Sequence, residues 1–270
     1  MSPTSWTPAA LLADLLACLR FYSRLPVPVL AFEREPFAML DFRRATRMLP
    51  MAGALLGALG GLALWLASRA GLSPLPASAL AIAALLLATG CFHEDGLADT
   101  ADGFGGGASI ARKLEIMKDS RIGTYGGAAL VLSLLLRVIL LAELVGIFGV
   151  PATVTIMVCA AAASRAVALM PLTLLPAART DGAAFAAAKP SSSALVMAGC
   201  VSILLAAVPL AAGVPTSRLG LGLLAMLVAA ALMTEISRRQ IGGQTGDVAG
   251  AAQQLAEIAF LCVLASHAAL

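Results

Sequence analysis

Long apolar stretches separated by short polar segments dominate this chain. A bilayer core of about 30 Å needs roughly 20 apolar residues in a helix, and seven stretches meet that length. They lie at 48–68, 75–91, 126–149, 151–175, 194–214, 218–236 and 251–269. The third and fourth are separated by a tight turn at Pro151. The pattern predicts an all-α, polytopic membrane bundle of about seven transmembrane helices, forming a single domain over 1–270.

The N-terminal segment 1–47 differs from these spans. Its apolar part, 9–19, is too short to cross a bilayer, contains Asp14 and is followed by Arg20, Arg24 and Pro26. No small-residue cleavage site follows, which argues against a secretory signal peptide. We therefore expect an amphipathic helix that lies at the membrane surface or enters it partway.

Composition agrees with a membrane protein and excludes several other classes. The chain is 60% hydrophobic, with 18 Lys and Arg and 15 Asp and Glu in 270 residues. Soluble domains are nearer a quarter charged. Aromatic residues make up only 5%, which does not fit an outer-membrane barrel with aromatic girdles. A net charge of +3 is too small for a nucleic-acid binder. The five cysteines are odd in number and lack CxxC spacing, which is typical of small apolar packing residues.

The positions of Lys and Arg predict the orientation in the membrane. Fourteen of the 18 lie on one side of the seven spans, in the segments 1–47, 92–125, 176–193 and 237–250. The opposite side has only Arg69 and Arg218, and Arg137 and Arg165 lie within spans. Because cytoplasmic loops carry the excess of cations, the N-terminus is predicted to be cytoplasmic and the C-terminus to lie outside.

The segment 92–125 is the one long loop that the pattern predicts, and it is rich in acids. It contains six of the 15 carboxylates, among them Asp95, Asp99 and Asp102. Spacing of i, i+4 and i+7 places these three within an arc of about 60° if the second span continues as a helix. Carboxylates that repel one another favour a hard cation, and oxygen ligands point to Mg²⁺ or Mn²⁺. A solvated acidic helix end is the alternative. His93 is expected beside the metal ligands, or exposed, rather than as a ligand.

Groups suited to phosphate follow these acids. Gly105, Gly106 and Gly107 let backbone N–H groups approach a phosphate, and a helix starting near Ser109 would add its N-terminal dipole. Cations come next, with Lys118 and Arg121 on either side of Asp119. The alternatives are ordinary loop glycines and cations that only set topology. Together, carboxylates, glycines and cations are the parts that phosphoryl transfer needs.

A second polar cluster, with Gln244, Thr245 and Asp247, precedes the last span on the same side. Asp247 is predicted to complete the metal site or to act as base on an attacking hydroxyl, with helix capping as the alternative. Three further polar residues enter the span on one face: Gln253, Gln254 and Glu257. Such groups are costly in lipid and indicate a polar interior.

Two cations lie at membrane depth. For Arg165, a structural ion pair with Glu257 or Glu143 and a contact with substrate are both open. Arg137 is expected to pair with Glu143 or to extend toward the interface.

Four stretches resemble the cobalamin synthase family, the adenosylcobinamide-GDP ribazoletransferases. They are the Phe-Tyr-Ser-Arg-Leu-Pro-Val-Pro run at 21–28, the acidic and glycine-rich block at 93–107, the Lys-Asp-Ser-Arg-Ile-Gly-Thr-Tyr-Gly run at 118–126, and 243–250 with its continuation through Glu257. They occur in order over nearly the whole chain. Tyr22 and Ser23 stand where Phe and Thr are commoner, and Gln244 stands where an aromatic residue is frequent.

The resemblance implies a Mg²⁺-dependent enzyme of a prokaryotic inner membrane, with its active site facing the cytoplasm. It implies that adenosylcobinamide-GDP is joined to α-ribazole, or to its 5′-phosphate, with release of GMP. One or two Mg²⁺ ions are assigned to Glu94, Asp95, Asp99 and Asp102. Lys118 and Arg121 are assigned to the leaving phosphate and Asp247 to the attacking hydroxyl. Further substrate contacts are assigned to Gly105, Gly106, Gly107, Asp119, Arg165, Gln244 and Thr245.

The sequence leaves two other classes of function open. A phosphotransferase of the CDP-alcohol type would show Asp-Gly-x-x-Ala-Arg, whereas here Gly96, Leu97 and Ala98 lead to Asp99. A transporter would show internal repeats and mid-membrane charges, which fits less well. Glycines such as Gly53 permit close helix packing within or between subunits, which leaves a homo-oligomer open. Replacement of Asp14 or Asp41 is expected to have little effect.

Overall fold

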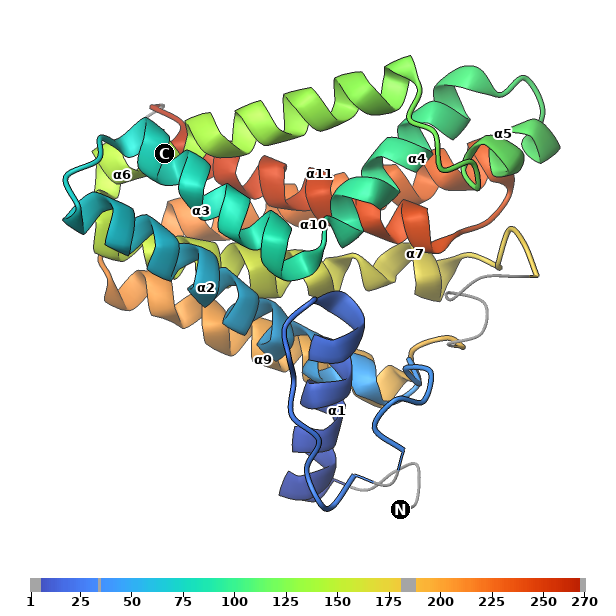
Figure 1. The fold of residues 1–270 in the computed structure, drawn as a ribbon, viewed down its shortest axis with the longest axis horizontal. Coiled ribbons are helices and arrows are strands. Elements are labelled where there is room, and N and C mark those ends of the chain that lie inside the picture. Colours follow the sequence, from blue (N-terminus) through green and yellow to red (C-terminus); the bar gives the residue numbers. More distant parts are fainter. Residues whose placement is uncertain (1–5, 34, 181–187, 268–270) are drawn as a thin grey trace.

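Residues 6–33, 35–180 and 188–267 are described in the computed structural model, and their regular structure is helical (Figure 1). The helices, in chain order, are α1 (Pro8–Tyr22), the 3-10 turn η1 (Ala45–Met48), α2 (Leu49–Arg69), α3 (Pro74–Thr89), α4 (Phe92–Gly106), α5 (Ile110–Ile116), α6 (Thr124–Val167), α7 (Leu169–Leu174), α9 (Ser192–Ala211), α10 (Thr216–Ile241) and α11 (Gly246–Ala265). The predicted all-α class is therefore confirmed.

Five helical runs are long and apolar enough to cross a membrane, or six if the bent pair α3 and α4 forms one span. One of the five runs combines α6 and α7, and α6 alone has 44 residues. A straight helix of that length would measure about 66 Å, more than twice a bilayer core. Instead, α6 breaks at Gly149, whose φ of 78° is non-helical, and its two halves run antiparallel in Figure 1. The turn predicted near Pro151 is present, while the count of seven crossings stays a prediction.

The chain bends by 89° between α3 and α4. Gly90 and Cys91 both adopt left-handed backbone conformations, with φ of 62° and 59°, and this ends α3. Residues 92–125 were predicted as a loop, but they contain α4 and α5. The second apolar span does not continue straight into the acidic segment, because α4 begins on a new axis. The Asp95, Asp99 and Asp102 spacing still falls on one helix.

Close packing of α2 on the second half of α6 explains the glycines of α2. A Cβ atom at Gly53 would meet the Ala161 carbonyl, and one at Gly57 would lie 2.7 Å from the Met157 carbonyl. These glycines therefore let two helices of the same chain approach each other. Between packing within and between subunits, which the sequence left open, the structure shows packing within the chain for this face.

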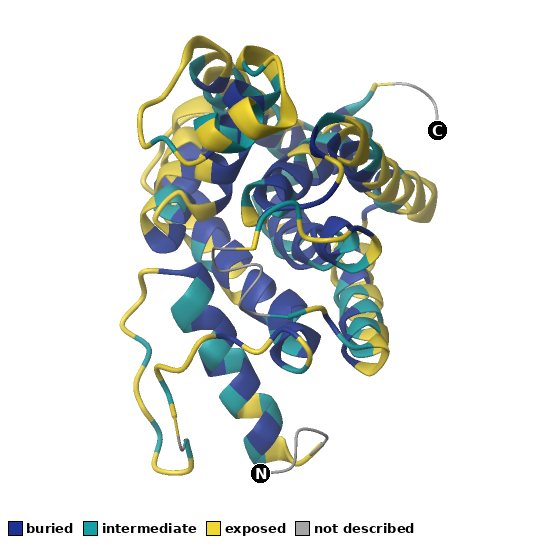
Figure 2. Cartoon of the chain, turned by 90° about the vertical axis from the view of Figure 1, so that its right-hand side faces the viewer, coloured by how far each residue is buried: buried dark blue, intermediate teal, exposed yellow. Residues whose placement is uncertain are grey.

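Apolar side chains also cover the outside of the bundle. Figure 2 shows the buried faces of the helices turned toward one another and the exposed faces turned outward. Large apolar residues on those outer faces include Leu62, Leu87, Leu132 and Ile203, the last 75% exposed. A soluble protein rarely exposes contiguous apolar surface of this extent, so this outer surface is suited to lipid.

Helix α1 projects from the bundle in Figure 1 and is anchored by a buried carboxylate. Asp14 is 1% exposed and pairs with Arg44 and Arg47, each through an Nη2 atom at 2.7 Å. Arg47 is itself buried and lies over the ring of Trp6. Removal of one partner from a buried pair costs about 3–5 kcal/mol. The expectation that Asp14 is dispensable is therefore wrong, because the sequence did not show that its partners come from residues 44 and 47.

Candidate functional site

Helices α4 and α11 bring the two predicted polar clusters together. They pack against each other at Gly96 and Gly250, where a Cβ atom on Gly96 would lie 2.8 Å from the Asp247 carbonyl. We call the carboxylates of Asp95, Asp99, Asp102 and Asp247 the acid cluster. Asp95 is exposed, Asp99 half-buried and Asp102 buried. Residues separated by about 150 positions in the chain therefore lie together where α4 packs on α11, and their joint role in a site stays a prediction.

Asp99 feels the charges of the other three carboxylates of the cluster. Burial, together with the negative charges of Asp95, Asp247 and Asp102, raises the pKa of Asp99 from 3.8 to about 7, and Arg179 opposes this effect. A carboxylate with this pKa is only partly ionised at neutral pH. The acid cluster therefore holds more negative charge than Arg179, which pairs with Asp247, can balance.

Asp247 lies in the first turn of α11 and is held by two donors. Arg179 donates to its Oδ2 atom at 3.2 Å, and the Thr245 hydroxyl lies 3.1 Å from the same oxygen. Thr245 is the residue that caps α11, since its Oγ1 atom accepts from the Val248 N–H. The alternative of Asp247 as the helix cap is thus excluded, and its carboxylate is directed toward Arg179.

Arg179 is a site residue that the sequence analysis missed. It was counted only among the cations that set topology. A short parallel bridge joins Ala177 to Gln244, with hydrogen bonds from Ala178 N to Gln244 O and from Gln244 N to Pro176 O, both 2.9 Å. This bridge carries Arg179 to Asp247. Nothing in the local sequence around position 179 signals the contact, because the partner strand segment is about 65 residues away.

Asp102 has a second role within the site. Its Oδ2 atom accepts from Gly123 N at 2.7 Å, and its Oδ1 atom accepts from Gly126 N at 2.8 Å. These N–H groups belong to the start of α6, which otherwise lacks a side-chain cap. A side chain at Gly123 or Gly126 would collide with the carboxylate. Asp102 therefore anchors the 118–126 segment to α4.

The glycine-rich stretch serves packing in the structure. Gly105 and Gly106 form the last turn of α4, and α5 begins four residues after Gly106. A Cβ atom on Gly105 would lie 2.6 Å from the Tyr125 ring, and Gly107 lies against Lys113. Helix α5 does start after Ser109, as predicted, but it has only seven residues. The assignment of Gly105, Gly106 and Gly107 to phosphate binding stays a prediction.

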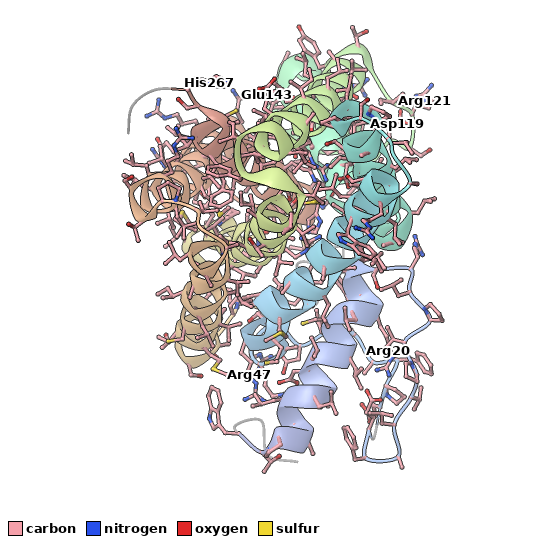
Figure 3. The ribbon with its side chains drawn as sticks, turned by 90° about the vertical axis from the view of Figure 1, so that its left-hand side faces the viewer. Arg20, Arg47, Asp119, Arg121, Glu143 and His267 are labelled. Atoms are coloured by element: carbon pink, nitrogen blue, oxygen red, sulfur yellow. The ribbon has the colours of Figure 1, made fainter. Side chains whose placement is uncertain are left out.

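The Lys118, Asp119 and Arg121 unit lies at the surface. Asp119 accepts from the Arg121 backbone N–H at 3.1 Å and from Arg121 Nη2 at 2.6 Å. These hydrogen bonds lower the pKa of Asp119 to about 2. The Arg121 side chain is 87% exposed, Lys118 is exposed as well, and Figure 3 shows Asp119 and Arg121 at the edge of the molecule. Asp102 is what connects this unit to the acid cluster.

Glu94 faces away from the acid cluster into a buried network. Its Oε1 atom accepts from Arg137 Nη1 at 2.7 Å and from Gln254 Nε2 at 3.0 Å. Arg137 Nε lies 3.3 Å from Glu257 Oε1, and Gln253 donates to Glu257 at 2.7 Å. We call these five residues the buried network. The structure does not bring Glu94 to the predicted metal ligands, and Arg137 pairs with Glu94 and Glu257 instead of Glu143.

Arg165 and His93 lie next to the buried network. Arg165 is buried and donates from Nη1 to the Ala161 carbonyl at 2.9 Å. Its Nε atom has no hydrogen-bond partner among the described residues. His93 is 4% exposed and stacks on Tyr22, with ring centroids 5.6 Å apart. Burial, followed by the charges of Arg165 and Arg137, holds the pKa of His93 well below its usual range, so the imidazole is neutral.

The acid cluster does not form a complete metal cage. Within 6–33, 35–180 and 188–267, no three His, Cys, Asp or Glu side chains converge closely enough to hold a metal ion by themselves. The donors are oxygen atoms only. Mg²⁺ is usually held by one or two carboxylates, with water and substrate phosphates completing its octahedron. The cluster fits a metal bound in that way, together with a phosphate ligand.

Comparison with known proteins gives one consistent match. The cobalamin-5-phosphate synthase family matches residues 14–265. An adenosylcobinamide-GDP ribazoletransferase of Azorhizobium caulinodans is 51% identical over 254 residues, covering 93% of this chain and 94% of the relative. Enzymes of the same name from Xanthobacter autotrophicus and Bradyrhizobium diazoefficiens are 50% and 42% identical, covering 92% and 98% of this chain and 94% and 98% of their own lengths. No solved structure matches the chain.

Proposed function

The chain belongs to the cobalamin-5-phosphate synthase family, and we propose that it catalyses the assembly of the nucleotide loop of cobalamin. It joins adenosylcobinamide-GDP to α-ribazole, or to α-ribazole 5′-phosphate, and releases GMP. A ribose hydroxyl attacks the phosphorus that carries the corrinoid arm. The bond from that phosphorus to the GMP oxygen breaks, and the hydroxyl proton goes to a base on the enzyme. The enzyme is thus a transferase of a substituted phosphate group.

The acid cluster is the observation that carries this proposal. A pyrophosphate substrate is itself anionic, so a site rich in carboxylates binds it only through cations. The raised pKa of Asp99 supports a local excess of negative charge. When bound, Mg²⁺ or Mn²⁺ would supply positive charge for the substrate phosphates and would neutralise charge that develops on the leaving group. Asp95 and Asp99 would hold it, because Asp102 is engaged by α6 and Glu94 by Arg137.

Asp247 is the candidate base for the attacking hydroxyl. Arg179 and Thr245 both contact its Oδ2 atom and so fix the orientation of the carboxylate at the start of α11. A base positioned in this way takes the proton as the new bond forms. The guanidinium of Arg179 lies beside the same carboxylate, where it balances the charge of a bound phosphate.

The remaining predicted contacts are assigned to the edge of the site. Lys118 and Arg121 stand on the segment that Asp102 anchors, and they stabilise the leaving phosphate when substrate binds. Gln244 is 5% exposed, and its Oε1 atom has no hydrogen-bond partner in the described part of the chain. This buried acceptor beside Asp247 is free for a donor group of the substrate.

The membrane assignment rests on charge and surface together. The apolar outer faces of the bundle contact lipid, and the cation-rich segments lie on the cytoplasmic side of a bacterial inner membrane. The acid cluster belongs to these cation-rich segments. Its carboxylates come from 92–125 and 237–250, and Arg179 comes from 176–193. The nucleotide substrates therefore reach the site from the cytoplasm.

A direct assay tests the proposal. Purified full-length protein in detergent is incubated with Mg²⁺, adenosylcobinamide-GDP and α-ribazole, and the products are measured by mass. We expect equal amounts of cobalamin and GMP, and loss of both when EDTA replaces Mg²⁺. A parallel reaction with diacylglycerol in place of α-ribazole tests a lipid acceptor. Absence of cobalamin, or a lipid product alone, overturns the proposal.

A further inference from the structure

A groove of about 540 Å³ lies between the end of α6, α7, α9 and α10. All of its lining residues belong to helical runs that are long and apolar enough to cross a membrane. The lining is apolar apart from the hydroxyls of Thr173 and Ser202. Each hydroxyl donates at 2.8 Å to a carbonyl of its own helix, so neither O–H is left for an occupant. Water would therefore gain little by filling the groove, whereas hydrocarbon suits it.

Small residues form the groove, but they do not close it. Ala163, Ala166, Ala198 and Gly199 belong to its lining. On α2, a Cβ atom at Gly53 would collide with the neighbouring helix, whereas a Cβ atom at Gly199 would meet nothing within 4 Å. The small residues of α9 therefore leave space at this face.

The groove opens on the outer surface of the bundle, where α9 lies along the lower edge in Figure 1. Two of its lining residues are largely exposed, Ile203 at 75% and Leu174 at 65%. On α9 the lining runs from Leu195 to Ile203, about 12 Å along the helix, which is most of the roughly 15 Å depth of one leaflet of a bilayer core. The groove thus has the position and the length of an acyl chain in one leaflet.

Positive charge marks one end of the groove. Lys189 is exposed, and its Nζ atom donates at 3.4 Å to the carbonyl of Thr173, a lining residue. The N-terminus of α9, capped by Ser191, lies two residues further along the chain and adds the positive end of a helix dipole. Both belong to the 176–193 segment, which the cation pattern assigns to the cytoplasmic side. An anionic headgroup would be attracted to this end.

We propose that this groove binds one acyl chain of an anionic phospholipid from the cytoplasmic leaflet, with the lipid phosphate beside Lys189. One water needs about 10–15 Å³ of such volume, so 540 Å³ has room for about 40 water-sized groups. A methylene group is close to a water molecule in size, so a complete acyl chain fits. Each methylene that is buried strengthens the association. The inference rests on the membrane assignment in the proposed function and not on the reaction.

A groove-filling variant tests the proposal, with dioleoyl-phosphatidylglycerol as the probe and native mass spectrometry of the full-length protein as the measurement. Gly199→Leu fills the groove, and the fold should tolerate it because a Cβ atom there meets open space. Gly220→Leu is the matched control, since Gly220 is also helical and open but does not line the groove. Gly199→Leu should bind the lipid at least tenfold more weakly than the wild type and Gly220→Leu. Equal binding by all three overturns the proposal.

The headgroup contact is tested separately. Lys189→Gln should weaken the binding of dioleoyl-phosphatidylglycerol at least threefold and leave that of dioleoylglycerol, which lacks a phosphate, unchanged. Arg112→Gln, which removes an exposed cation outside the groove, should change neither. An unchanged affinity in Lys189→Gln contradicts the proposal, and this comparison decides should Gly199→Leu not fold.

Two further outcomes are distinct. A lipid-free dimer of the wild type that Gly199→Leu dissociates would assign the groove to a second copy of the chain and overturn the proposal. Lipid binding is measured without substrates, so its failure is separate from a failure to form cobalamin.

Discussion

Helices α4 and α11 carry two polar regions that differ in how their charges are balanced. In the buried network, the carboxylates of Glu94 and Glu257 share Arg137, and each also accepts from an amide, Glu94 from Gln254 and Glu257 from Gln253. In the acid cluster, four carboxylates lie near one another, and Arg179 contacts one of them, Asp247. The charges of Glu94 and Glu257 are matched when the neighbouring Arg165 is counted with Arg137, whereas the four carboxylates of the acid cluster face the charge of Arg179.

This difference separates a structural role from a functional one. A buried, closely paired set of charges fixes how two helices pack and has little left to offer a ligand. Carboxylates that raise one another's pKa repel one another in the folded protein. This repulsion lowers the stability of the fold, and a bound cation removes it. The comparison therefore favours a helix-positioning role for Glu94, Arg137 and Glu257, and it supports the proposal of cation-dependent chemistry at Asp95, Asp99 and Asp247.

Asp99→Asn is expected to lower kcat more than any of the other changes. This change removes a charge from the centre of the acid cluster and adds no bulk. If the metal stabilises the transition state by several kcal/mol, loss of that stabilisation lowers kcat by about 10³-fold or more. GMP release from adenosylcobinamide-GDP measures it, with Glu115→Gln on the exposed face of α5 as the matched control. Normal turnover in Asp99→Asn would remove the distinction between the two regions.

Arg137→Met tests the buried network. It leaves Glu94 and Glu257 buried without their cation, which should lower the free energy of unfolding by about 3–5 kcal/mol. Thermal unfolding in detergent measures the loss. Adding Glu94→Gln and Glu257→Gln to the same variant should restore most of the stability. A variant that is as stable as the wild type but inactive would place Arg137 in the chemistry instead.

Arg179→Met tests the cation of the acid cluster. Loss of one preorganised charge beside a reacting phosphate typically costs about 10²-fold in kcat. We expect a fall of about that size in kcat/KM, with little change in thermal stability because Arg179 lies at the edge of the bundle. Arg112→Met, in an exposed pair with Glu115, is the control. Equal effects of the two changes would argue against Arg179 as a site residue.

A pH and metal comparison tests the charge imbalance directly. The pKa of Asp99 is raised from 3.8 to about 7, so the folded state binds the proton more tightly than the unfolded state. The stability from this proton is present at low pH and is lost as the pH rises toward and through 7. Mg²⁺ should therefore raise the melting temperature more at pH 8 than at pH 5.5. Asp99→Asn should show a smaller difference, and an equal response at both pH values would contradict the shift.

The smallest loss of activity is expected from a change in the exposed unit of Lys118, Asp119 and Arg121. Arg121 is exposed and already paired with Asp119, and exposed pairs are worth about 0–1 kcal/mol. Arg121→Gln should therefore lower kcat/KM by about fivefold or less. If this variant loses more activity than Arg179→Met, Arg121 contributes more to catalysis than Arg179, and Arg179 is not the main cation of the site.

Much of the site could be predicted from the sequence because it is encoded locally. Asp95, Asp99 and Asp102 share a helix face by spacing alone, and that spacing holds even though α4 starts on a new axis. Gly105, Gly106 and Gly107 were assigned to phosphate, yet two of them end α4 and pack against side chains, because glycine serves close approach as readily as anion binding. Composition does not distinguish the two uses.

The sequence by itself determined the all-helical class, the apolar spans, the turn near Pro151 and the family. These follow from local periodicity and from motifs read in order. Only the tertiary structure decided which charges meet. It placed Arg179 on Asp247, Arg137 on Glu94, and Arg44 and Arg47 on Asp14. The physical reason is that an ion pair is set by distance in space, and partners tens of residues apart leave no periodic signal in the chain.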